Sequence, residues 1–239
     1  MSYTYATYQT ALAQLMVFQS TADADFVAIL PSIIDYAEQR CYRELDLLSA
    51  TVTDSAAATA NTRSFTLPQN QGRFVVPESY SVITPLGAVT ANSVRTPLIA
   101  VNKEFIDFCW PSDQATAASV TPQYFAPLTD QTILLAPPPG AAFVIEVRGK
   151  IRPVPLYTNT TGTWLSLYVP ELFIAASMVF ASGWMKNFGS QSDNPQMAVS
   201  WETQFNTLLK SAEIEEARRR FAGAGWSSHA PEPIAASPR

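Results

Sequence analysis

Residues 163–177 read TWLSLYVPELFIAAS, and residues 37–48 read AEQRCYRELDLL. Both stretches have the apolar spacing that is typical of helices, and the long segment between them is rich in proline and in β-forming residues. Two helical ends around a β insertion are a layout typical of assembly modules. We therefore predict an α+β fold. In this fold the N- and C-terminal segments form a helical bundle. The middle of the chain forms a central antiparallel β insertion, a small sandwich or barrel, and an extended C-terminal tail follows the last helix.

Composition limits the class of protein. The chain has 239 residues, of which 47% are hydrophobic and 15% charged, with a net charge of −5. This length can bury a real core in one large domain or two small ones. A surface poor in charge favours an oligomer, although a monomer with many Ser, Thr, Gln and Asn on its surface is the alternative. The negative balance argues against a broad nucleic-acid footprint.

The N-terminus has no Lys or Arg before Arg40, so it lacks the basic region of a secretory signal. The longest charge-free apolar run in the C-terminal half, residues 172–185, is too short to span a membrane. We expect a protein that is soluble and cytosolic when made, with no membrane partner.

Helical periodicity predicts four main helices. We expect one over residues 4–18, one over 31–45 with Pro31 in its first turn, and a central buried helix over 170–187. The fourth helix is expected to begin after Asp193, which caps it, and to end at Phe221. Arg40 and Glu44 are four residues apart and place polar groups on the outer face of the second helix. The expected domains are a helical body (residues 1–48 and 165–222), a β-rich insertion (49–164) and a flexible C-terminal arm (223–239).

Short strands punctuated by proline are expected in the insertion, over residues 65–67, 74–76, 81–84, 96–101, 123–126, 133–135 and 143–151. Residues 55–62 contain only small side chains and predict an exposed mobile loop, or alternatively a short helix. The PPPG sequence at residues 137–140 predicts a hairpin turn between the last two strands. Asn102 is expected to cap a short helix over residues 103–108.

No catalytic cluster is apparent. His229 is the only histidine and lies in the unpatterned tail, which gives neither a triad nor a zinc site. Cys41 and Cys109 are both expected to be buried apolar residues, with a disulfide as the less favoured alternative. Acids that could meet in space are more simply surface residues: Glu78, Asp107, Asp113 and Glu146. We expect no enzyme activity, no cofactor and no metal.

The C-terminal region offers candidate binding residues. Trp226 and Ile234 are large apolar residues in a tail without periodicity, and such residues can order on a partner, although Trp226 could instead fold back onto its own helix. Arg218, Arg219 and Arg220 either contact an acidic protein partner or form a solvated helix end next to the negative helix dipole.

The order and spacing of four phrases resemble the head-to-tail adaptor (connector) proteins of tailed bacteriophages. The phrases are IIDYAEQRCYRELDLL, FTLP, YFAPLTDQTILLAPPPGAAFVIEVRGKIRPVPL and TWLSLYVPELFIAASMVFASGWM, and the resemblance covers roughly residues 33–209. The loop around residues 53–61 and the tail after Gly223 depart from it.

The resemblance implies a virion structural protein of the head-tail neck. In that family a ring, typically of twelve copies, docks on the portal protein, carries tail or nozzle proteins and leaves a channel for genomic DNA without sequence-specific binding. It makes residues 223–239, with Arg218–Arg220, Trp226 and Ile234, the candidate portal-binding arm. It also implies assembly in the host cytoplasm.

A tail-side β module that binds host glycan or other tail proteins is the alternative function. Exposed Trp110, Tyr124 and Trp164 in β loops would favour it, and burial of these three side chains would oppose it. An enzyme of unknown type is a third, weaker hypothesis.

Overall fold

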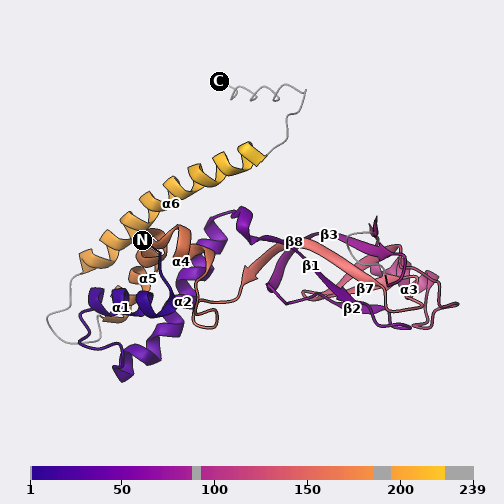
Figure 1. Ribbon diagram of the computed structural model, residues 1–239, viewed down its shortest axis with the longest axis horizontal. Coiled ribbons are helices and arrows are strands. Elements are labelled where there is room, and N and C mark those ends of the chain that lie inside the picture. Colours follow the sequence, from indigo (N-terminus) through magenta and orange to yellow (C-terminus); the bar gives the residue numbers. More distant parts are fainter. Residues whose placement is uncertain (1, 88–92, 186–194, 224–239) are drawn as a thin grey trace. The chain divides into compact units, whose positions relative to one another are not determined.

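The computed structural model describes residues 2–87, 93–185 and 195–223, which form six α-helices and eight strands (Figure 1). The chain divides into two compact units. Unit 1 comprises residues 1–2, 9–48 and 168–239, and unit 2 comprises residues 3–8 and 49–167. Helices fill the first unit and two sheets the second, which confirms the predicted α+β class.

In unit 1, α5 (Pro170–Met185) packs against both α2 (Ala24–Glu44) and α6 (Pro195–Gly223). The prediction of a buried helix here is confirmed, because Leu172, Phe173 and Met178 are nearly inaccessible. The Ser177 hydroxyl donates to the Phe173 carbonyl at 2.6 Å, which satisfies a polar group that the apolar surroundings would otherwise penalise. Its predicted last residues, and the expected Asp193 cap, lie outside the described residues.

The start of α2 differs from the prediction. The helix begins at Ala24, and Pro31 lies inside it rather than in its first turn. Asp23 caps it, since the carboxylate Oδ1 accepts hydrogen bonds from the N–H groups of Asp25 and Phe26 at 3.0 and 3.3 Å. Buried Phe26 and Leu30 continue the apolar face by two turns, and this packing outweighs the hydrogen bond that the proline cannot donate. Helix α1 (Tyr5–Leu15) is shorter than the predicted residues 4–18.

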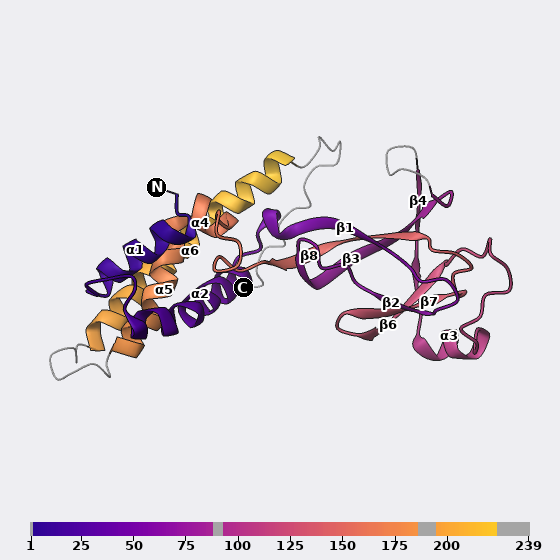
Figure 2. The same ribbon diagram turned by 60° about the horizontal axis from the view of Figure 1, so that its bottom comes forward.

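Unit 2 contains two four-stranded sheets, which Figure 2 separates clearly. Sheet A has the order β1 (Thr51–Ala57), β8 (Val144–Pro153), β3 (Gly72–Thr84), β4 (Val94–Pro97), all antiparallel. Sheet B has the order β2 (Ser64–Thr66), β7 (Thr132–Ala136), β6 (Tyr124–Thr129), β5 (Ile99–Ala100), and only β5–β6 is parallel.

The inner faces of the two sheets share one apolar cluster, so unit 2 is built as a sandwich. Alternation along β8 is as predicted, because Ile145, Val147 and Ile151 are buried between more accessible neighbours. Three short elements complete the described chain: the 3₁₀ turn Leu48–Ala50, α3 (Lys103–Cys109) and α4 (Trp164–Tyr168).

The predicted hairpin around residues 137–140 is wrong. Strand β7 lies in sheet B and β8 in sheet A, so the proline-rich segment carries the chain from one sheet to the other. Both edges of β8 are already occupied, by β1 and β3. The exposed loop predicted for residues 55–62 is wrong in its first half, because β1 extends to Ala57 and pairs with Val144.

Three smaller predictions are also corrected. Residues 74–76 and 81–84 belong to one strand, β3, in which register shifts on either side of Val76 and Pro77 accommodate the proline. Residues 96–101 contribute to two strands in different sheets. Asn102 occupies the N-cap position of α3 but makes no capping hydrogen bond through its side chain.

Candidate functional site

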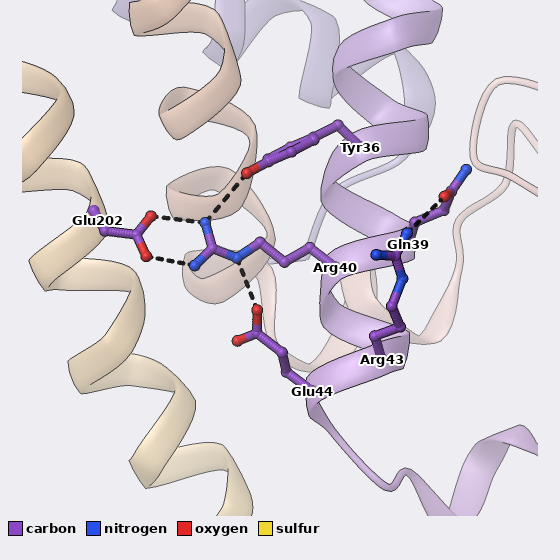
Figure 3. Close-up of a pocket in the computed structure, with 6 residues that line it drawn as sticks. All are labelled: Tyr36, Gln39, Arg40, Arg43, Glu44 and Glu202. Carbon is purple, nitrogen blue, oxygen red and sulfur yellow. Dashed lines mark hydrogen bonds and ion pairs between the residues drawn. The ribbon is translucent and has the colours of Figure 1, made fainter.

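The most developed polar cluster of unit 1 lies between α2 and α6, around Arg40 (Figure 3). Its Nη1 and Nη2 donate to the two carboxylate oxygens of Glu202 at 2.7 and 2.5 Å, and its Nε donates to Glu44 at 3.0 Å. The Tyr36 hydroxyl accepts a longer bond from Nη1, at 3.4 Å. The guanidinium also lies 4.0 Å from the ring centroid of Phe205.

These contacts stabilise the charged forms of both Arg40 and Glu202. The hydrogen bonds to Glu202 raise the pKa of Arg40 further above its usual value, against the opposing effect of burial. The same hydrogen bonds hold the pKa of Glu202 below its ordinary value. Arg40 therefore stays paired and charged, so it is suited to joining two helices and not to proton transfer.

A hollow of about 470 Å³ beside this pair is lined by Gln39 and Arg43 as well as by the residues of the cluster. The Arg43 guanidinium donates to the Gln39 side chain at 3.1 Å and points away from Arg40, as Figure 3 shows. Arg40 and Glu44 were expected to make the outer face of this helix polar; they pair at 3.0 Å, but Arg40 faces α6 and its side chain is only 16% exposed. Glu202 was not recognised from the sequence. It lies 162 residues from Arg40, and sequence spacing gives no signal that links residues so far apart.

The second polar cluster joins the end of α6 to the residues that follow α2. Buried Glu216 accepts a hydrogen bond from the Leu48 backbone N–H at 3.1 Å and pairs with Arg219 at 3.0 Å. Arg220 donates to the carbonyl and pairs with the carboxylate of Asp46. Arg219 also pairs with Glu215, four residues earlier on the same helix, at 3.1 Å.

The three predicted arginines thus have different surroundings. Arg219 and Arg220 make contacts within unit 1, whereas Arg218 is exposed and has no acidic partner in the described part of the chain. Trp226 and Ile234, like His229, lie outside the described residues. Whether any of these residues contacts a portal stays a prediction.

The cysteine prediction is half correct. Cys41 is buried, but Cys109 is exposed at the end of α3, and both are free thiols. Cys109 is the last residue of α3, a seven-residue helix in which Ile106 is the buried residue. Burial raises the pKa of Cys41 to about 12, which keeps this thiol protonated and unreactive.

The aromatic residues of the alternative hypothesis are half-buried. Trp110 and Tyr124 pack against each other, with ring centroids 5.8 Å apart, and Phe105 contacts both rings. Trp110 and Tyr124 also pack on an apolar cluster under α3. Trp164 is half-buried in α4. Packing accounts for Trp110 and Tyr124 without a ligand.

Over residues 2–87, 93–185 and 195–223, no group of acidic, cysteine and histidine side chains is arranged to hold a metal ion. No helix in those ranges is both long and apolar enough to cross a membrane. The acids considered above are in ordinary surroundings: Asp107 and Asp113 pair with Arg63 at 2.9 and 2.8 Å, and Glu146 pairs with Arg95 at 2.7 Å.

The described residues thus form a helical unit joined by ion pairs and a β sandwich. Comparison with protein families gives the class of protein: the family model described as SU10 adaptor protein matches residues 3–229. The chain therefore belongs to the SU10 adaptor protein family, a family of phage adaptor proteins. No curated protein matches the chain.

Proposed function

We propose that this chain is the head-to-tail adaptor of a tailed phage. A ring of twelve copies docks on the portal protein and joins the DNA-filled head to the tail or nozzle proteins. The observation that carries this proposal is the family match across residues 3–229, nearly the whole chain. The low charged fraction supports it, because ring subunits cover much of their surface with neighbouring copies.

The proposed role is structural. The ring leaves a channel through which genomic DNA passes without sequence-specific binding, and the negative net charge suits a channel to which DNA does not adhere. The protein acts at the neck of the virion and assembles in the host cytoplasm. It needs no cofactor and catalyses no reaction in this role.

Within this proposal the C-terminal arm contacts the portal. Arg218 is exposed next to the arm and lacks an acidic partner in the described ranges, so it is the arginine best suited to an acidic partner surface. Arg219 and Arg220 have a different main task, because they already bind Glu215, Glu216 and Asp46. Trp226 and Ile234 are the apolar anchors of the arm.

Electron microscopy of the purified protein, alone and mixed with portal, tests the proposal. A twelvefold ring on the portal is the expected result, and a stable monomer without portal affinity would contradict the adaptor role. A chain that ends at Phe221 keeps the ion pairs of α6, so it should remain folded by circular dichroism yet fail to dock. Docking that survives this truncation would rule out the arm as the portal contact.

The arginine assignment has its own control. Arg218→Glu should weaken docking, whereas Lys210→Glu makes the same change of charge at another exposed position of α6 and should not. Equal effects of the two variants would contradict a specific role for Arg218.

A further inference from the structure

The outer face of sheet A is an accessible, positively charged surface. Alternation along β8 buries Val147 and Ile151 and turns Arg148, Lys150 and Arg152 to the other face. On β3, Arg73 lies directly opposite Arg152. Like charges in directly opposite positions destabilise a sheet, so the pairing of these two arginines is not explained by folding alone.

Acidic side chains neutralise this face only in part. Arg73 pairs with Asp130 at 2.5 Å, but both side chains are more than half exposed, and solvent weakens such a pair. Arg148 is 4.0 Å from Glu78. Arg152 has no acidic partner within the described ranges. The guanidinium groups of Arg148 and Arg152 therefore remain available for an anionic partner.

Apolar side chains accompany the cations. Val76 is 52% exposed and lies opposite Lys150 in the register. A hollow of about 330 Å³ beside Arg73 and Arg152 is completed by Gln69, Gly72, Pro153, Val154 and Pro155. Protein interfaces combine arginine with apolar groups in this way, whereas a DNA backbone needs only cations and hydrogen-bond donors. The composition favours an acidic protein surface.

The chain itself carries such a surface. By sequence, unit 1 contains thirteen Asp and Glu against eight Lys and Arg, and unit 2 contains seven of each, so the whole net charge of −5 lies in unit 1. A hollow of about 270 Å³ in unit 1 is lined by four acids and a single cation: Glu44, Asp46, Glu213, Glu216 and Arg220. Arg40, Arg219 and Arg220 already pair with three of these acids, whereas Glu213 is exposed and has no cationic partner in the described ranges.

We propose that the outer face of sheet A, at Arg73, Val76, Arg148, Lys150 and Arg152, docks on the acidic hollow around Glu213 of a second copy of the chain. The two surfaces are different, so the contact is head-to-tail and repeats from copy to copy. This inference rests on the proposed ring and names the surfaces that hold neighbouring subunits together.

Sedimentation velocity measures the self-association. The wild-type protein should associate at low ionic strength and dissociate as salt rises, because screening weakens contacts between exposed charges. Arg148→Glu combined with Arg152→Glu should weaken association about tenfold or more. The control Lys103→Glu reverses a charge at an exposed position of α3, outside both proposed surfaces, and should associate normally.

Charge exchange gives the decisive result. Glu213→Lys alone should also weaken association, and an equimolar mixture of this variant with the Arg148→Glu, Arg152→Glu protein should restore it, since each altered surface then meets its complement. A mixture that stays dissociated would overturn the inference, as would a wild-type protein that is monomeric at low salt.

Two further readouts separate this interface from the other possibilities. A fluorescent DNA duplex should show no change in anisotropy that depends on Arg148 and Arg152; binding lost in that variant would assign the face to DNA and overturn the proposal. Rings that form normally on the portal from the Arg148→Glu, Arg152→Glu protein would refute this interface and leave the adaptor function intact.

Discussion

Arg40 on α2 and Glu202 on α6 form a two-pronged ion pair that joins the N-terminal and C-terminal parts of the helical unit across 162 residues of sequence. The Arg40 side chain is 16% exposed and that of Glu202 39%, so water screens the pair only in part. The planar guanidinium matches the carboxylate with two parallel hydrogen bonds, a geometry that the single ammonium of lysine cannot reproduce.

Replacement of Arg40 should therefore lower stability. Arg40→Ala removes the paired hydrogen bonds, the Glu44 contact and the stacking on Phe205, and we expect the free energy of unfolding to fall by about 1.5–3 kcal/mol in urea titrations. Arg40→Lys should recover only part of this loss. The control is Arg43→Ala, one turn away, whose partner is Gln39 and whose effect should stay within about 0.5 kcal/mol. Equal losses in both alanine variants would contradict a special role for the Arg40 cluster.

The same pair should make stability depend on pH. Hydrogen bonds from Arg40 hold the pKa of Glu202 in the folded protein below the ordinary 4.5. A lowered folded pKa means that the contribution is complete above the unfolded pKa and is lost as the pH falls through the folded one. The difference in unfolding free energy between wild type and Arg40→Ala should thus be constant near neutral pH and shrink below about pH 4.5. A difference that persists unchanged into strong acid would argue against the pair as its source.

Sequence periodicity predicted the elements whose pattern of apolar and polar residues reflects which side of the element is buried. Ile145 and Val147 are buried between more accessible neighbours because one side of β8 faces the core, and the large apolar residues on most sides of α5 reflect its position between two helices. These signals are local, so they can be recognised without knowing the tertiary partners.

The incorrect predictions concern segments whose structure depends on contacts with residues far away in the sequence. The residues around Ala57 have little strand propensity, yet they pair with Val144 because β8 offers a free edge there. The PPPG segment has the composition of a hairpin turn, but its flanking strands belong to different sheets. The roles of Glu202 and Glu216 also depend on contacts with residues distant in sequence, Arg40 and the Leu48 N–H respectively. The two polar clusters therefore could not be derived from sequence spacing.

Two glycines should respond in opposite ways to alanine. A Cβ at Gly149 in β8 would lie 2.4 Å from the Val76 carbonyl oxygen and 2.7 Å from the Pro77 Cα, both backbone atoms at the irregular part of β3. Gly149→Ala should therefore cost about 1–3 kcal/mol of stability. A Cβ at Gly183 in α5 meets nothing within 4 Å, so Gly183→Ala should instead stabilise the helix, by about 0.5–1 kcal/mol. Thermal unfolding of both variants checks the contrast, and a neutral Gly149→Ala would show that the two strands separate easily.

The two thiols should differ in reactivity. Burial raises the pKa of Cys41 to about 12, so almost no thiolate exists there at neutral pH, and the side chain is also inaccessible to a reagent. Cys109 is exposed on α3. Titration of the native protein with a chromogenic disulfide at about pH 8 should label one thiol per chain quickly and the second only after denaturant is added. Cys109→Ser should abolish the fast phase, whereas Cys41→Ser should preserve it and remove only the phase that follows unfolding. A fast phase that remains in Cys109→Ser would mean that the helices around Cys41 open readily in the native protein.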